Sequence, residues 1–227
     1  VRELMGFSTT EWDYGQQAIV ATVQIEKCHK ATAWQRFSAT GPLAFLPLPG
    51  GGNTHYCSIV WSCDNWLAEE LISLDDQQFC KRLSAEFEFT LGDVLGVSDR
   101  AFFPLRQSHA VSYFKPLVAL VGDSAHSIHP LAGQGLNIGL LDVDVLSEEL
   151  LWAQKSDIEI GSLEVLARYQ RRRRGENLQM MLAMDGFKRL FGSRKIPLRW
   201  LRNEGLRSVD KMQWIKKRII NYAMGLA

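Results

Sequence analysis

The segment at residues 117–137, LVALVGDSAHSIHPLAGQGLN, constrains the fold of this 227-residue chain more than any other segment. Residues 117–121 are apolar, too few for a helix and without alternating polar residues, so they predict a strand buried on both faces of a parallel sheet. Gly122 permits a tight turn, and Asp123 then projects at the carboxyl end of that strand. Open α/β folds bind their ligands at this edge.

The helix expected after this strand begins almost bare of side chains. Pro130 stiffens the connection, while Gly133 and Gly135 let a ligand approach the free N–H groups of the first helical turn. Those groups and the helix dipole favour negative charge, and the Asp123 carboxylate accepts hydrogen bonds from hydroxyl groups. The segment predicts a ligand with both a polyol and an anionic or electron-rich edge. On the residues alone, a capping aspartate followed by a glycine turn remains an alternative.

Two further patterns in this segment could mark a metal site or a dinucleotide-binding site. His126 and His129 have a metal-ligand spacing, but no third ligand lies nearby, so loop histidines that hydrogen-bond locally are favoured. GQGLNIG, residues 133–139, follows a long loop instead of a strand and fits the dinucleotide-binding fingerprint poorly. No metal site and no catalytic side chain is therefore assigned.

The chain changes from β-rich to helical near residue 115. Asp75 and Gln78 have the form of a capping box, which predicts a helix that ends at Gly92. Extended segments are predicted at residues 17–25, 33–39, 43–48, 56–62 and 101–114, and later helices at 133–153, 162–190, 197–205 and 208–224. The pattern therefore indicates a mixed class, α+β or α/β, with mostly antiparallel strands.

Charge is distributed unevenly along the chain. From Arg168 onward there are 16 Lys or Arg against 4 Asp or Glu, whereas the preceding residues hold 10 against 21. The basic tail interleaves its cations with Trp, Phe, Ile and Met. A solvated surface that balances the acidic body, contact with an anionic membrane, and a subunit contact remain open. Nucleic acid is not expected as a partner, because no recognition fold accompanies the charge.

Composition indicates the compartment. No run approaches the roughly 20 apolar residues that a membrane-spanning helix needs, and the first residues lack the layout of a signal peptide. The four cysteines show neither CxxC nor zinc-like spacing and are expected to be reduced thiols. The expected location is cytoplasmic.

Residues 122–146, GDSAHSIHPLAGQGLNIGLLDVDVL, resemble the second flavin-binding signature of the aromatic-ring flavoprotein monooxygenases, the para-hydroxybenzoate hydroxylase-like family. The HPLAGQGLN version resembles the ubiquinone-biosynthesis branch of that family. The resemblance implies that Asp123 holds the ribityl chain of FAD and that the backbone N–H groups of Leu136 and Asn137 face the pyrimidine edge of the flavin. It also implies that Pro130 lines the flavin and substrate side. With Gly122, Gly133 and Gly135, these form the expected cofactor-binding set.

The resemblance implies an enzyme that uses FAD, NAD(P)H and O₂ to hydroxylate a polyprenylated phenol in ubiquinone biosynthesis. Such a substrate lies in the bilayer, so peripheral contact with the inner membrane is also expected. Two alternatives stay open. One is a non-catalytic lipid-binding or assembly module derived from such an enzyme, and the other is a flavin oxidoreductase that transfers hydride without using O₂.

In the family, a βαβ unit with G-x-G-x-x-G holds the ADP half of FAD. No such motif is found in this sequence, so the chain is expected to be the C-terminal portion of a longer protein and to hold FAD poorly by itself. Three parts are expected: a β-rich substrate-type domain at 1–115, a partial FAD-binding domain with a remnant of the parallel sheet at 116–155, and a helical region at 156–227. Exposed strand edges in a partial sheet favour a homo-oligomer.

Overall fold

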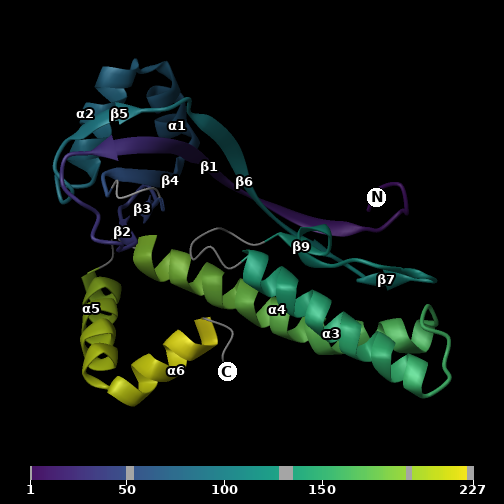
Figure 1. Cartoon of the computed structure of the whole chain (residues 1–227). Coiled ribbons are helices and arrows are strands. Elements are labelled where there is room, and N and C mark those ends of the chain that lie inside the picture. Colours follow the sequence, from purple (N-terminus) through teal and green to yellow (C-terminus); the bar gives the residue numbers. More distant parts are fainter. Residues whose placement is uncertain (1, 50–53, 128–134, 193–195, 224–227) are drawn as a thin grey trace. The chain divides into compact units, whose positions relative to one another are not determined.

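The computed structural model describes residues 2–49, 54–127, 135–192 and 196–223 (Figure 1). These residues form two compact units, which are described separately. One unit comprises Tyr14–Leu105, and the other combines Val1–Asp13 with Arg106–Ala227. Two strands, β1 (Thr9–Ile25) and β6 (Ala101–Ala110), contribute residues to both units. The three-part division expected from the sequence concerns function and stays a prediction.

The unit at Tyr14–Leu105 is built on an antiparallel sheet. Strands β2 (Trp34–Phe37), β3 (Pro42–Pro47) and β4 (Tyr56–Asp64) precede β1 in the sheet order β2-β3-β4-β1, and β5 (Val94–Val97) also pairs with β1. Alternate β4 side chains are buried, as expected of strands with one face on a core. The predicted antiparallel strands are therefore confirmed, with β5 as an addition.

Two helices cover this sheet, whereas the sequence predicted one. The predicted helix is α2 (Asp76–Glu86), and its capping box is formed: Gln78 N donates to the Asp75 carboxylate at 2.8 Å. The additional helix is α1 (Asn65–Ser73), which follows β4 directly, and no cap hydrogen bond comes from the Asp64 side chain. Because the strand passes into the helix with no loop between them, little in the sequence separates the two elements.

In the second unit, the segment 117–121 pairs differently from its prediction. It contains β8 (Val118–Ala119), which forms an antiparallel hairpin with β7 (Phe114–Lys115). The predicted parallel strand is therefore wrong for these residues. A parallel pair needs a crossover connection of a dozen or more residues, whereas here the chain turns back at once. Beyond it come η1 (Gly122–Ser124) and β9 (His126–Ser127), which pairs with β6.

Four helices complete this unit: α3 (Gly135–Lys155), α4 (Leu163–Gly192), α5 (Ile196–Lys211) and α6 (Gln213–Ala223). The predicted start of α4 is confirmed, since Val165 N donates to the Ser162 hydroxyl at 3.4 Å. Helix α5 continues through Gly205, where the sequence predicted a break, because one glycine costs a helix only about 1 kcal/mol. None of the described helices is both long and apolar enough to span a bilayer.

Helices α3 and α4 lie side by side (Figure 1). Charged pairs join the two helices. The carboxylate of Glu149, buried on α3, accepts hydrogen bonds from Arg168 Nε at 2.6 Å and from Arg172 at 2.9 Å. The Arg168 guanidinium also stacks on the Trp152 ring, 3.8 Å from its centroid. At the start of α4, basic residues thus pair with acidic residues of α3.

Candidate flavin site

The turn that carries Asp123 is held by local hydrogen bonds. Val121 is extended, and Gly122 has a φ of +56°, a conformation that favours glycine. The Ser124 hydroxyl donates to the carbonyl oxygen of Val121 at 2.7 Å and accepts from Val121 N at 3.1 Å. Asp123 is solvent-exposed at the apex of this turn. The chain therefore directs one carboxylate to the surface from a fixed backbone.

This turn lies directly against α3. A Cβ built on Gly139 would lie 3.2 Å from the Cα atom of Gly122, and a Cβ built on Gly122 would lie 3.5 Å from the Cα of Gly139. The first of these distances is tighter than most real Cβ contacts allow. Glycine at both positions thus lets the two backbones touch, and it brings Asp123 beside the early turns of α3.

The N-terminal turn of α3 is open. A Cβ built on Gly135 would meet nothing within 4 Å, and Leu136 is 74% exposed. Asn137 is exposed as well. In general, the first N–H groups of an α-helix make no hydrogen bond to carbonyl groups of the same helix, so an exposed helix N-terminus is a place where anionic or electron-rich ligands bind. The remaining two predicted site residues, Pro130 and Gly133, lie outside the described residues.

Asp123 also borders a surface depression of about 450 Å³. The residues that line it are Arg2, Glu3, Leu4, Asp123 and Ser124. Charged, hydroxyl and apolar groups therefore meet next to the Asp123 carboxylate, which suits a ligand with both hydroxyl groups and an aromatic or aliphatic part.

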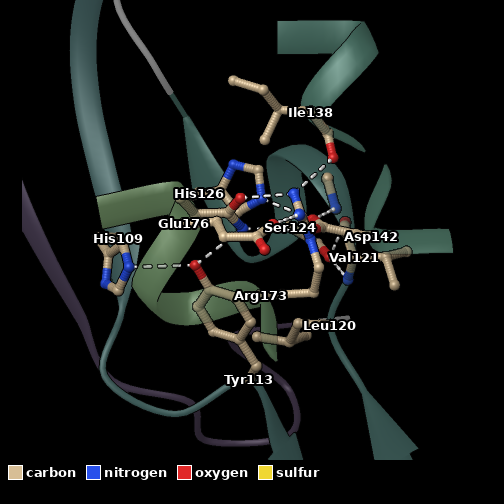
Figure 2. A network of polar contacts seen from close by, with 12 residues as sticks. His109, Tyr113, Leu120, Val121, Ser124, His126, Ile138, Asp142, Arg173 and Glu176 are labelled. Atoms are coloured by element: carbon tan, nitrogen blue, oxygen red, sulfur yellow. Dashed lines mark hydrogen bonds and ion pairs between the residues drawn. The ribbon is translucent and has the colours of Figure 1, made fainter. Parts of the chain in front are cut away.

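Beneath the turn lies a buried carboxylate, Asp142 of α3, which is fully excluded from solvent (Figure 2). One of its oxygens accepts hydrogen bonds from Gly122 N at 2.9 Å and from His126 Nε2 at 2.6 Å. The other accepts from Arg173 Nε at 2.7 Å and from Asn177 Nδ2 at 3.1 Å. Both oxygens are thus fully occupied by donors from the turn, β9 and α4.

These donors determine the charge of Asp142. Burial by itself raises the pKa of a carboxyl group, but the hydrogen bonds from His126, Arg173 and Asn177 outweigh it and lower the pKa of Asp142 to about 2. The carboxylate is therefore ionised at neutral pH. Since an ionised carboxylate only accepts hydrogen bonds, His126 Nε2 carries a proton.

The network continues away from the turn. Asn177 Nδ2 also donates to the Tyr113 hydroxyl at 3.3 Å, and that hydroxyl lies 3.1 Å from His109 Nε2. Burial raises the pKa of Tyr113 to about 12, and burial also lowers the pKa of His109. The Tyr169 hydroxyl donates to the carbonyl oxygen of Leu120, just before the turn, at 2.8 Å. The turn is thus supported from below by a chain of neutral and paired polar groups.

Sequence reasoning placed the surface residues of this site together but missed its buried support. Asp142 stands within the quoted 25-residue segment, yet Arg173 and Asn177 lie on α4, more than 30 residues further along the chain. The one signal for them was the RRRR run, of which Arg173 is buried and Arg172 is not. The favoured interpretation of His126, a histidine that hydrogen-bonds instead of binding metal, agrees with its bond to Asp142.

Comparison with solved structures gives the class of fold. Against p-nitrophenol 4-monooxygenase PnpA from Pseudomonas putida DLL-E4, the TM-score is 0.74 at 19% sequence identity, with 99% of this chain and 56% of that chain covered. Residues 1–181 match the family described as FAD binding domain. The chain belongs to this FAD-binding family.

Several curated relatives with names from ubiquinone biosynthesis are similar in sequence to this chain. The chain is 38% identical over 226 residues to 3-demethoxyubiquinol 3-hydroxylase of Escherichia coli strain K12, with 100% of this chain and 56% of the relative covered. It is also 38% identical over 225 residues to ubiquinone hydroxylase UbiL of Rhodospirillum rubrum, with 99% and 52% covered. The chain therefore spans about half the length of the curated relatives it matches.

The described residues fit the flavin part of FAD. An exposed carboxylate at Asp123 suits the hydroxyl groups of the ribityl chain, and the open first turn of α3 presents N–H groups to an electron-rich ring edge. The absence of a Cβ at Gly135 leaves room for a flat ring to approach the helix end.

Proposed function

We propose that this chain is the C-terminal portion of an FAD-dependent aromatic monooxygenase that hydroxylates a polyprenylated phenol in ubiquinone biosynthesis. The names of the curated relatives support the substrate class. One observation carries the proposal for this chain: the Asp123 turn rests on the early turns of α3 through the contact between Gly122 and Gly139, beside an open helix N-terminus.

In this proposal, FAD, when bound, supplies the redox chemistry by which electrons from NAD(P)H activate O₂ for insertion into the phenol ring. Asp123 accepts hydrogen bonds from the ribityl hydroxyl groups and thereby fixes the orientation of the flavin. The N–H groups of Leu136 and Asn137 donate to the pyrimidine edge, and the positive end of the α3 dipole stabilises negative charge there. Gly122 and Gly135 permit these approaches, and Pro130 and Gly133 complete the proposed set. The exposed Leu136 side chain adds apolar cover against water.

The first experiment examines the purified native protein that contains this chain. Bound flavin absorbance, together with NAD(P)H oxidation that yields a phenol product one oxygen atom heavier, is expected. NAD(P)H oxidation without an oxygenated product would favour hydride transfer alone. Colourless protein that takes up no added FAD but still binds a prenylated phenol would contradict the proposal and favour a lipid-binding module.

The second experiment tests Asp123 itself. Asp123→Ala removes charge-assisted hydrogen bonds worth about 1.5–3 kcal/mol, so the Kd for FAD is expected to rise by roughly 10- to 100-fold. Asp144→Ala, which removes an exposed carboxylate from the same helix bundle, is the matched control and should bind FAD normally. Equal affinities for both variants would show that Asp123 does not hold the ribityl chain.

A peripheral membrane surface on α5 and α6 is a further part of the proposal. Residues 196–223 contain seven Lys or Arg against two Asp or Glu. Trp200 is 66% exposed and Trp214 is 69% exposed, and Lys217 and Arg218 are exposed as well. Exposed tryptophans together with cations on amphipathic helices are typical of contact with an anionic bilayer. Such a surface would hold a cytoplasmic enzyme near a substrate that lies in the inner membrane.

Co-sedimentation with vesicles tests this surface. We expect binding to phosphatidylcholine vesicles that contain phosphatidylglycerol, weaker binding to phosphatidylcholine alone, and release at high salt. Replacing Trp200 and Trp214 together by Ala should weaken binding several-fold, whereas Trp66→Ala, which removes another exposed tryptophan, should not. Indifference to vesicle charge and to the double replacement would contradict the membrane contact.

Self-association also belongs to the proposal. Apolar side chains are exposed at the end of the α3–α4 pair, including Leu117, Leu151 and Ile160. Leu117 N donates to the carbonyl oxygen of Gly161 at 3.3 Å, and the Leu117 side chain lies against Gly161. Light scattering of the native protein, with and without Leu151→Lys, measures whether this surface joins two copies.

A further inference from the structure

We propose that Asp142 is the positioning residue of the flavin site, whose buried carboxylate fixes the Asp123 turn against the first turns of α3. The inference rests on the proposed function, because it concerns the same site. Asp142 does not itself reach the surface and so does not contact the ligand. It acts through the backbone of Gly122 and through its partners on β9 and α4.

The carboxylate holds the turn from both sides. Gly122 N, immediately before Asp123, donates to one Asp142 oxygen, and His126, three residues after Asp123, donates to the same oxygen. The intervening residues are closed by a further hydrogen bond from Ala125 N to the carbonyl oxygen of Gly122 at 2.8 Å. One buried oxygen thus accepts hydrogen bonds from both ends of the turn (Figure 2).

The second oxygen ties the turn to α3 and α4. Arg173, which donates to it, also donates to the carbonyl oxygen of Ile138 at 3.4 Å, close to the start of α3, and to Asn177 Oδ1 at 2.7 Å. Glu176 adds an ion pair to the same guanidinium. The two parts of the proposed site, the Asp123 carboxylate and the open helix end, are therefore joined through one charged pair.

The Asp142–Arg173 ion pair matters more for the geometry of the turn than for the stability of the fold. A buried ion pair contributes little net stability compared with apolar residues of the same size, whereas its hydrogen bonds fix geometry. Here the geometry that is fixed is the backbone on which Asp123 stands. The contact between Gly122 and Gly139 sets the same distance independently. The Asp142 hydrogen bonds and the Gly122–Gly139 contact thus both determine the spacing between the turn and α3.

Gly139→Ala tests this spacing without removing a buried charge. Its methyl group would lie 3.2 Å from the Cα of Gly122 and push the turn outward, while alanine favours the helix. The Kd for FAD of the native protein is expected to rise by about tenfold or more, with an unchanged or higher thermal midpoint. Gly175→Ala on α4, where a Cβ meets nothing within 4 Å, is the control and should change neither Kd nor thermal midpoint beyond what helix preference adds.

Asp142→Asn supplies the second variant, with amide hydrogen exchange of the flavin-free protein as its readout. Faster exchange that is largest in residues 121–127, together with weaker FAD binding, is expected. If Gly139→Ala and Asp142→Asn bind FAD as wild type does, or if exchange in residues 121–127 is unchanged, the positioning role is wrong and the proposed function stands. If wild type binds no FAD at all, the proposed function itself fails.

Discussion

At the scale of single residues, the sequence could predict the proposed ligand-facing residues because they are nearly contiguous. Asp123, Gly135, Leu136 and Asn137 lie within one segment. A glycine-rich helix start by itself predicts a site that ligands can approach closely. The supporting residues could not be predicted in the same way. A buried arginine and an exposed one read alike in RRRR, and only packing of α4 against α3 separates Arg173 from its neighbours.

The depressed pKa of Asp142 predicts a pH dependence of stability. Its pKa is about 2 in the folded protein against an ordinary value of 3.8, so its contribution is present above about pH 4 and is lost as the pH falls through 2. A shift of this size corresponds to about 2 kcal/mol. At neutral pH, Asp142→Asn should lose about 3–5 kcal/mol of unfolding free energy, because it leaves Arg173 buried without its charged partner. Denaturant unfolding should show this loss shrink by about 2 kcal/mol between pH 4 and pH 2.

Asp144→Asn controls for the other carboxylates that titrate in the same range, because it changes an exposed aspartate two positions along α3. Its unfolding free energy should follow that of wild type at every pH to within about 0.5 kcal/mol. A constant difference between wild type and Asp142→Asn over this range would contradict the low pKa of Asp142.

At the scale of elements, local sequence signals predict where helices and strands form, but they do not predict which strands pair. The capping box at Asp75, the cap at Ser162 and the strand β4 are all formed as the sequence predicts. The apolar run at 117–121 was misassigned to a parallel sheet, because periodicity alone cannot say which strand is its neighbour. Instead, a two-residue turn between β7 and β8 decides the pairing.

The Asp75 cap offers a test at this scale. Asp75→Ala removes the carboxylate that accepts from the Gln78 N–H and leaves only the backbone N–H of residue 75 to bond the Gln78 side chain, so the free energy of unfolding should fall by about 1 kcal/mol. Gln77→Ala, at a neighbouring exposed position of α2, should change it by less than about 0.5 kcal/mol. Urea denaturation of both variants makes the comparison, and equal midpoints would show that the cap contributes nothing measurable.

At the scale of the whole molecule, the chain combines an antiparallel β unit with a helical unit that carries the proposed flavin-binding residues. The ribityl and pyrimidine parts of FAD have candidate partners in Asp123 and the start of α3, whereas no G-x-G-x-x-G is found in the sequence for the pyrophosphate. Family membership and overlap with about half of each curated relative agree with this division. The affinities of the chain for FAD and for its fragments therefore measure which part of the cofactor these residues bind.

The chain expressed alone should bind FAD and riboflavin with similar affinity, within about threefold. Both ligands contain the isoalloxazine ring and the ribityl chain, which are the parts that Asp123 and α3 are proposed to hold. Lumiflavin, which lacks the ribityl hydroxyl groups, should bind at least about tenfold more weakly, since it offers Asp123 nothing to accept from. Quenching of flavin fluorescence during titration measures all three constants under one set of conditions. An affinity for FAD more than a hundredfold above that for riboflavin would place a strong ADP-binding site within these residues. Equal binding of riboflavin and lumiflavin would remove the role of Asp123.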